Sequence, residues 1–386
     1  MSDKTYLQWP FFEERHRQLS ADLEKWSTDN LAGIDHNDTD EACKSLVKAL
    51  GDGGWCDYSG VDPDSATSTL DVRSLCLIRE TLARYDGLAD FAFAMQGLGT
   101  GAISLFGTYA QQNQWLTATR TGDALSAFAL TEPQSGSDVA NSTMSAIRHG
   151  DSYVLNGEKT WISNGGIADV YTVFARTGDA PGARGLSAFV VPASIPGFEV
   201  VERLNTIAPH PLARLHFSDC RIPVSALLGQ QGQGFKIAMS VLDVFRPTVA
   251  AAALGFARRA LDEALDRVLS REIQGTAMAE LQMVQGHIAD MSLNIDTSAL
   301  LVYRAAWLKD TGAPRVTREA AMAKLFSTEQ AQKVIDQSVQ LHGGDGVREG
   351  MVVEKLYREI RALRIYEGAS DVQKIIIARQ TLASHL

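Results

Sequence analysis

The chain has 386 residues, with 36 lysines and arginines against 46 aspartates and glutamates, so its formal net charge is −10. This length is sufficient for two or three packed units, and an acidic balance without a basic stripe disfavours a nucleic-acid partner. The start of the chain lacks a basic segment followed by an apolar one, and no uninterrupted apolar stretch reaches membrane-spanning length. We therefore expect a soluble, cytoplasmic protein without a membrane partner.

The predicted elements fall into three regions along the chain. Residues 1–124 carry apolar residues at a spacing of three and four, which predicts a helical N-terminal domain. Residues 125–233 contain short β-rich runs punctuated by Gly, Asn and Pro, which is typical of an antiparallel barrel or sandwich. Residues 234–386 return to longer helices, and Pro247 is expected to kink or restart the first of them. The predicted fold is mainly α with a central β domain.

Two features that often indicate chemistry are interpreted as structural here. The cysteines at positions 43, 56, 76 and 220 are scattered without CxxC spacing, so we expect reduced, structural thiols and no metal site. The segment "GLGTGA", from Gly97 to Ala102, has the letters of a dinucleotide-binding fingerprint. No β-branched strand precedes it and no βαβ unit follows it, so we expect these glycines to permit close helix packing.

Two segments of the β region carry groups suited to an oxygen-rich or heteroaromatic ligand. "TEPQSGSD", from Thr131 to Asp138, combines hydroxyls and a carboxylate with turn residues, and its donors would suit a pyrophosphate. The alternative is an ordinary Pro/Gly surface turn. "KTWISNGG" places the flat ring of Trp161 near the hydroxyl of Ser163. Such a tryptophan packs either in the core or against a heteroaromatic cofactor.

Two further segments near the C-terminus carry glycines beside polar groups. "QLHGGDGV", from Gln340 to Val347, ends a helical run, and its glycines either cap that helix or let a ligand approach the backbone. In "ALRIYEGASDVQ", the lone acid Glu367 lies between Tyr366 and Gly368 in apolar surroundings. A carboxylate shielded from water gains proton affinity, as a general base requires, and the alternative is a turn acid that caps the next helix.

Five blocks in a fixed order carry a family resemblance: "FALTEPQSGSD", "NGEKTWISNGG", "FRPTVAAAALGFARRALDEAL", "QLHGGDGV" and "IYEGASDVQ". In order and spacing they resemble the acyl-CoA dehydrogenase family from about residue 125 to the end. The resemblance implies an α-helical N-terminal domain (1–124), a central β domain (125–233) and a C-terminal four-helix bundle (234–386). It also implies FAD as cofactor and oxidation of an acyl-CoA thioester to the trans-2-enoyl-CoA.

The resemblance implies that Glu367 is the base that takes the α-proton, while the β-hydride passes to the flavin and an oxyanion hole polarises the thioester carbonyl. A branch of the family draws its base from the residue before the arginine of "DVFRP". Here that residue is Phe245, which cannot accept a proton. The positions that correspond to substrate-binding ones are Ser137, Asp243, Arg246, Tyr366 and Gly368, and Asp243 and Arg246 are expected to meet the pantetheine part of CoA.

The FAD-binding positions implied by the resemblance lie in several blocks. Those from the first two blocks are Phe128, Leu130, Thr131, Ser137, Trp161, Ile162 and Ser163. Those from the helical region are Arg271, Gln282, Gln340, Gly343, Gly344, Ala369 and Asp371. The chain departs from the usual pattern at Gln274, where phenylalanine is usual, and at Ala369 and Asp371, where threonine and glutamine are common. These departures change the contacts expected to the adenine part of FAD but leave the base in place.

The resemblance also implies partners. Positions that reach the adenine end of FAD contribute across a subunit contact in the family, so a homotetramer, a dimer of dimers, is expected, with an electron-transferring flavoprotein as acceptor. Two alternatives remain open: a flavin oxidase that passes electrons to O₂, and a redox-inert protein that binds FAD and acyl-CoA. The segment "IAPHPLARL" resembles enzymes for cyclic acyl-CoAs such as cyclohexanecarboxyl-CoA. The floor of the acyl pocket is expected near Met95 and Gln96.

Overall fold

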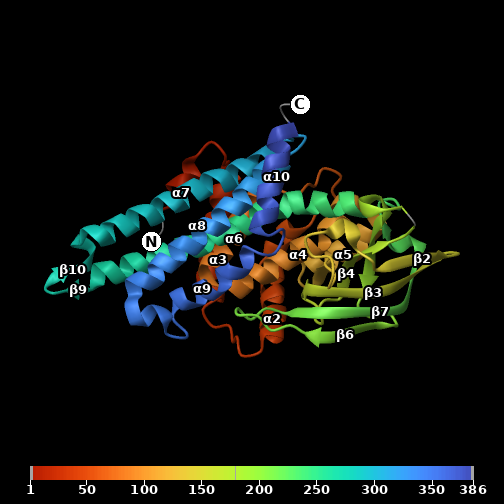
Figure 1. The fold of residues 1–386 in the computed structure, drawn as a ribbon, viewed down its shortest axis with the longest axis horizontal. Coiled ribbons are helices and arrows are strands. Elements are labelled where there is room, and N and C mark those ends of the chain that lie inside the picture. The colour runs from red at the N-terminus through yellow and green to blue at the C-terminus, as the bar shows by residue number, and fades with distance from the viewer. Residues whose placement is uncertain (1–2, 179, 384–386) are drawn as a thin grey trace. The chain divides into compact units, whose positions relative to one another are not determined.

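A computed structural model describes residues 3–178 and 180–383 (Figure 1). It contains two compact units, which we describe separately. The helical unit is drawn from Met1–Ala32, Asp71–Asp90 and Asp243–Leu386, and the sheet unit from Gly33–Leu70 and Phe91–Leu242. Each unit therefore contains pieces from distant parts of the sequence, so the two units do not coincide with three consecutive domains. The predicted boundaries after residues 124 and 233 stay predictions.

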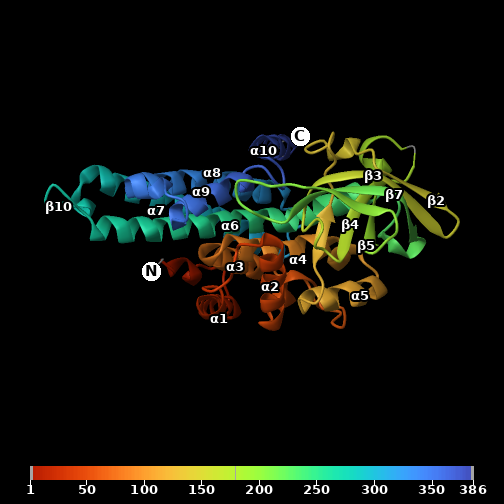
Figure 2. The same ribbon diagram turned by 90° about the horizontal axis from the view of Figure 1, so that it is seen from below.

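The helical unit is built from long helices (Figures 1 and 2), and its interior is made of buried apolar side chains. Within it, α7 packs against α8, and α8 packs in turn against α9 and α10, while α3 lies between α1 and α7. The bounds of its helices and of the hairpin that precedes α7 are α1 Glu14–Asn30, α3 Val72–Tyr85, α6 Gly234–Ser270, β9 Glu272–Ile273, β10 Thr276–Ala277, α7 Gln282–Asp310, α8 Thr317–His342, α9 Val352–Leu363 and α10 Ser370–Ala383; the first residues of α6 belong to the sheet unit.

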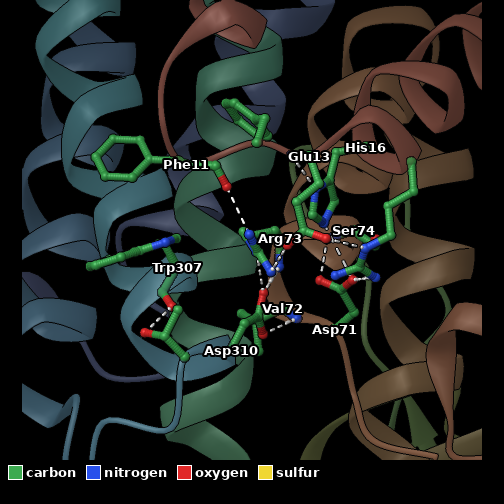
Figure 3. Close-up of polar contacts among 12 residues, drawn as sticks. Phe11, Glu13, His16, Asp71, Val72, Arg73, Ser74, Trp307 and Asp310 are labelled. Atoms are coloured by element: carbon green, nitrogen blue, oxygen red, sulfur yellow. Dashed lines mark hydrogen bonds and ion pairs between the residues drawn. The ribbon is translucent and has the colours of Figure 1, made fainter.

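A polar cluster at the start of α3 joins three segments of the helical unit (Figure 3). Asp71 caps the helix by accepting the backbone N–H of Ser74 at 3.2 Å. Asp310, the last residue of α7, accepts the N–H of Val72 at 2.8 Å and the Nε of Arg73 at 2.8 Å. The same guanidinium donates to the carbonyl of Phe11 at 2.8 Å. Carboxylates are favoured at a helix N-terminus, so this cluster fixes α3 against α7 and the N-terminal segment.

The long helix α6 differs from its prediction at Pro247. The helix runs unbroken from Gly234 to Ser270 with Pro247 inside it, so the predicted restart is wrong. Pro247 cannot donate to the carbonyl of Asp243 one turn earlier, and beside it the hydroxyl of Thr248 donates to the carbonyl of Phe245 at 2.8 Å. An 18-residue window of α6 reaches a mean hydropathy of 1.5, enough by length and composition to cross a membrane, but 83% of that window is buried in the fold.

The sheet unit contains one eight-stranded sheet in the order β6-β7-β3-β2-β4-β5-β8, with β1 paired to β4. Most neighbours are antiparallel, as predicted, but β1 runs parallel to β4, and so does one pairing of β2 with β4. The bounds are β1 Ser126–Ala129, β2 Ser145–His149, β3 Ser152–Ser163, β4 Val170–Arg176, β5 Leu186–Pro192, β6 Phe198–Arg203, β7 Leu212–Pro223 and β8 Leu227–Leu228; the helices are α2 Thr39–Asp52, α4 Gly87–Phe106, shared with the helical unit, and α5 Tyr109–Arg120.

The fold prediction is confirmed at the level of class: helices dominate, with a central sheet and long C-terminal helices. The "GLGTGA" segment lies inside α4, away from any strand-to-helix turn. A Cβ at Gly99 would collide with Ser126, so this glycine does permit close packing between α4 and β1. All four cysteines are free and buried, as expected of structural thiols.

Candidate functional site

The acid at position 367 lies in the turn between α9 and α10, in a strained backbone conformation. Glu367 has φ 53° and Gly368 has φ 96°, and the first value is unfavourable for a residue with a side chain. A Cβ at Gly368 would clash with the amide of Gln373, so glycine is required there. Gln373 donates its Nε2 to the carbonyls of Glu367 and Gly368, at 3.2 and 2.9 Å. The buried side chain of Gln373 therefore fixes the backbone of this turn through two hydrogen bonds.

One oxygen of the Glu367 carboxylate is buried and lacks a hydrogen-bond partner among the described residues. This oxygen is Oε2, and the residue as a whole is partly exposed. Burial raises the pKa of Glu367, while Arg79, Lys324 and Arg246 act to lower it. A buried, unpaired carboxylate with raised proton affinity has the properties of a general base. The backbone N–H of Glu367 likewise has no partner among the described residues.

The three cations near Glu367 differ in how far other carboxylates neutralise them. Arg79 of α3 is buried and forms a two-pronged pair with Asp90, with Nε and Nη2 each 2.8 Å from one carboxylate oxygen. Arg246 of α6 lies 3.4 Å from Asp243 through Nη1 and donates its Nε to the carbonyl of Glu367 at 3.4 Å. Lys324 of α8 donates to the carbonyl of Gly368 at 2.9 Å. Arg246 and Lys324 thus attach α6 and α8 to the turn, while Arg79 of α3 acts on Glu367 through its charge.

The helical unit therefore gathers most of the predicted substrate positions. Asp243, Arg246 and Gly368 are connected to Glu367 by the contacts above, and Tyr366 precedes it with 38% of its surface exposed. Asp243 is also held by Thr317, whose hydroxyl donates at 2.7 Å. Ser137 is the exception, because it lies in the sheet unit, exposed in the loop before β2.

In the sheet unit, a β-bulge turns Trp161 out of the sheet. The register of β3 against β7 shifts between Lys159 and Ile162, and Trp161 has φ 58° with 58% of its surface exposed. Ile162 points into the core, so only its backbone is available to a ligand. The N–H of Thr160 donates to the carbonyl of Thr131 at 2.9 Å, which joins the "TEP" turn to the bulge. Thr131 and Ser163 thus lie near the exposed Trp161 at one edge of the sheet unit, and their contact with a cofactor stays a prediction.

A buried ion pair that the sequence analysis did not identify supports this edge. Lys159 is fully buried and lies 2.8 Å from Glu132, the acid of the "TEP" turn. The same ammonium donates to the carbonyl of Leu130 at 3.1 Å, and Glu132 also accepts the N–H groups of Thr143 and Met144. Burial lowers the pKa of Lys159 to about 8. A lysine among β-branched and aromatic neighbours was the available signal for this pair.

Phe128 and Leu130 are two further positions of the sheet unit that were predicted to bind FAD. Phe128 packs its ring against Phe174, with centroids 4.9 Å apart, and remains partly exposed. Leu130 is buried, so the carbonyl that accepts from Lys159 is its main polar contact. Gln96 is fully buried and donates to the carbonyls of Thr119 and Ala124, and the expected pocket floor near Met95 and Gln96 stays a prediction.

The remaining cofactor positions of the helical unit lie in three groups. Arg271 and Gln282 are exposed beside the β9–β10 hairpin, where Gln274 (φ 52°) and Gly275 (φ 80°) form the tip. Gln340, Gly343 and Gly344 are exposed at the end of α8, which Arg267 ties to the end of α6 by donating to the carbonyl of His342 at 3.2 Å. Ala369 precedes α10 and Asp371 lies in its first turn, both close in sequence to the acid at 367.

The first group is far from Glu367 within the same chain. Arg246 contacts the carbonyl of Glu367, and Arg271 follows the last residue of the same unbroken helix. At about 1.5 Å of rise per residue, this separation is roughly 35 Å along α6. One FAD molecule is not expected to span from Arg271 to the acid of the same chain.

Comparison with known proteins places three family models on consecutive stretches of the chain. The model described as acyl-CoA dehydrogenase, N-terminal domain, matches residues 13–123, the middle domain matches residues 127–220, and the C-terminal domain matches residues 232–382. Together they cover most of the sequence, including the N-terminal third, which carried no motif.

Individual relatives agree with the family models. The chain is 39% identical over 346 residues to the mitochondrial short-chain specific acyl-CoA dehydrogenase of Rattus norvegicus, covering 88% of this chain and 83% of the relative. It resembles the structure of butyryl-CoA dehydrogenase from Megasphaera elsdenii with a TM-score of 0.88 and 32% identity, over 96% of this chain and 99% of that one. A chain from the structure of the electron transferring flavoprotein of Acidaminococcus fermentans gives a TM-score of 0.87 and 33% identity, over 96% and 98%. Other neighbours were solved with FAD or FADH2.

Proposed function

The chain belongs to the acyl-CoA dehydrogenase family and is an FAD-dependent enzyme of that class, and from this premise we propose that Glu367 is its catalytic base. The proposed reaction removes one hydrogen from each of the α and β carbons of an acyl-CoA thioester and forms the 2-enoyl-CoA. The observation that carries the proposal is the buried, unpaired Oε2 of Glu367, because such an oxygen is costly unless a ligand uses it.

The residues along the exposed edge of the sheet unit fit FAD. Trp161 offers a flat ring on a bulge, and Thr131 and Ser163 offer polar groups on either side of it. The flavin, when bound, accepts the hydride that leaves the β-carbon. We propose that Phe128, Leu130 and Ser137 complete this half of the FAD site.

The protein's own residues supply proton transfer and orientation. Glu367 accepts the α-proton through its carboxylate, and the free N–H of Glu367 is available to donate to the thioester carbonyl as negative charge develops there. The left-handed turn sets the direction of both groups at once, because they belong to one residue. We propose that Asp243 and Arg246 meet the pantetheine part of CoA.

We further propose that the enzyme works as an oligomer, a homotetramer built from dimers, in which one chain contributes to the FAD site of another. The support is the roughly 35 Å of α6 between Arg246 and Arg271, which one cofactor is not expected to cross. Large apolar side chains are also exposed on α7 and α10, as a subunit interface would require: Met283, Leu293, Leu300, Ile375 and Leu382. An electron-transferring flavoprotein is the proposed acceptor, and the cytoplasm the proposed location.

The test of the proposed function is anaerobic reduction of the flavin by thioesters. Short straight-chain thioesters come first, because relatives are named for short-chain and butyryl substrates, and cyclic thioesters such as cyclohexanecarboxyl-CoA follow. We expect Glu367→Gln to keep FAD and thioester binding but to reduce flavin at least about a thousandfold more slowly, because an amide cannot accept the α-proton. Glu349→Gln, an exposed acid in the loop before α9, is the matched control.

Three outcomes of that test would change the assignment. Wild-type reduction rates in Glu367→Gln would remove Glu367 from the mechanism. Flavin that stays oxidised with every thioester would favour a redox-inert binding protein. Stoichiometric peroxide during turnover in air, without any requirement for an electron-transferring flavoprotein, would identify an oxidase.

A further inference from the structure

Lys324 is a buried cation that the family resemblance did not single out. It is fully buried on α8, beside the small buried side chains of Ala320, Ala321 and Ala323. Burial lowers the pKa of its ammonium to about 8, against the opposing effect of Glu367. A lysine is rarely buried without a partner, because the ammonium loses its hydration. The position of Lys324 therefore calls for a compensating function.

The hydrogen bonds of Lys324 lead to the turn that carries the acid. Its Nζ donates to the carbonyl of Gly368 at 2.9 Å, and no carboxylate among the described residues lies within ion-pair distance of it. An ammonium has three N–H donors, so two remain for other groups. The neighbouring carboxylate of Glu367 has an unsatisfied Oε2. A buried acid and a buried cation thus act on each other without forming a closed pair.

The charges around Glu367 show why Lys324 is distinct. Arg79 is neutralised by a two-pronged bond to Asp90, and Arg246 by a longer contact to Asp243. The other charges that act on Lys324 are Glu329 and Arg364, which pair with each other at 2.8 Å. Asp90 acts to raise the pKa of Glu367, and the adjacent phenol of Tyr366 has its own pKa raised by burial. Lys324 is therefore the one nearby cation among the described residues without a carboxylate of its own.

From this arrangement we infer that Lys324 is a positioning residue for the reaction. Its hydrogen bond to Gly368 holds the left-handed turn, and its charge keeps the Glu367 carboxylate ionised in the enzyme before substrate binds. The inference rests on the proposed role of Glu367 as base. A purely structural lysine would fix the turn only, whereas this one also sets the pH at which the base becomes competent.

Three substitutions separate the two roles. Lys324→Met removes both the charge and the donor while keeping an unbranched side chain, Lys324→Gln keeps a donor without charge, and Lys324→Arg keeps both. The measurement is the rate of flavin reduction by a thioester as a function of pH, in holoenzyme with matched FAD content. Lys333→Met is the control, since Lys333 is exposed on the same helix.

We expect the rising limb of the pH–rate profile to move upward by about one pH unit or more in Lys324→Met and Lys324→Gln, because loss of an opposite charge raises the proton affinity of a carboxylate. Lys324→Arg should return the limb towards its wild-type position, and Lys333→Met should leave it unchanged. If Lys324→Met does not fold, Lys324→Gln provides the same comparison.

The outcomes separate this inference from the proposed function. If Glu367→Gln is inactive and the limb of Lys324→Met or Lys324→Gln coincides with that of the wild type, Lys324 does not set the charge of the base and the inference is wrong. If Glu367→Gln reduces flavin at the wild-type rate, the proposed function fails first, and the inference fails with it.

Discussion

Arg79 and Asp90 form a buried ion pair in which two guanidinium nitrogens each lie 2.8 Å from a different carboxylate oxygen. The third nitrogen of Arg79 donates to the hydroxyl of Thr248 at 3.1 Å. The pair lies beside Glu367 and affects its pKa with opposite signs, since Arg79 lowers it and Asp90 raises it. The neutrality of this pair is therefore a condition for the raised proton affinity of Glu367.

Asp90→Asn should destabilise the enzyme by about 3–5 kcal/mol, because it leaves a buried guanidinium without its counter-charge. The uncompensated charge should also lower the pKa of Glu367, so the rising limb of the flavin-reduction profile should move to lower pH. Denaturant unfolding and the pH–rate profile check the two effects. Glu41→Gln, which breaks the exposed pair with Lys44, should cost at most about 1 kcal/mol. A limb that moves to higher pH would contradict this account.

Lys159→Met should weaken FAD retention, because Lys159 holds the "TEP" turn against the strand that carries Trp161. It also leaves Glu132 buried without its cation, at a cost of about 3–5 kcal/mol. Adding Glu132→Gln to Lys159→Met should recover part of that cost, since the amide carries no charge. FAD occupancy after dialysis and unfolding midpoints of both variants test this, and a double variant that is less stable than Lys159→Met would oppose it.

The stability of the helical unit should depend on pH through Asp310 (Figure 3). Burial and the neighbouring carboxyl of Asp71, with which it shares a hydrogen bond, raise the pKa of Asp310 to about 6 from its usual 3.8. The folded state therefore keeps a proton that the unfolded chain has lost, so this contribution is full below pH 3.8 and disappears as the pH rises through about 6.

Unfolding free energies on either side of this window test the effect. Wild-type protein should lose on the order of 1–3 kcal/mol of this contribution as the pH rises across the window. Asp310→Asn, which cannot ionise, should show a flatter profile. An equally steep decline in Asp310→Asn would assign the effect to other groups.

Mixing two inactive variants tests whether FAD sites are shared between chains. Arg271→Ala should lose FAD, because the family resemblance assigns Arg271 to FAD binding, and Glu367→Gln should lose proton abstraction, because an amide cannot accept the α-proton. If Arg271 serves the site of another chain, a hybrid dimer contains one site with both native residues, and dissociation followed by reassociation should restore up to about a quarter of wild-type activity. Absence of any recovery in verified hybrids would show that both residues serve the same site.

The sequence indicated the turn at Glu367 because its signal is local: a lone acid stands between an aromatic residue and glycine, just before a helix. The structure shows that one carboxylate oxygen is buried and adds the left-handed φ at Glu367 and Gly368, while the role of Glu367 as base stays a proposal. The bulge at Trp161 was not predicted, because a bulge depends on the register between β3 and β7, which alternation within one strand does not reveal.

The charged surroundings of the site were not predicted for a different reason. Arg79, Asp90 and Lys324 lie in helices with apolar periodicity. In such a pattern a single charged residue is predicted to be exposed. Only the packing of α3 and α8 shows that these residues are buried. The restart predicted at Pro247 is wrong, because residues around it such as Phe245 and Val249 are buried and tertiary packing keeps the helix continuous. Long-range packing therefore decided what local rules could not.

The helical unit draws on three separated stretches of chain, with the whole segment Phe91–Leu242 inserted between Asp90 and Asp243. During synthesis, Arg79 emerges from the ribosome long before Lys324 and Glu367. The early helices of the helical unit therefore cannot complete their packing until the C-terminal helices have been synthesised. Their exposed apolar faces are then a ready target for chaperones. A polypeptide interrupted shortly before its last helix would lack the turn at 367, and with it the site.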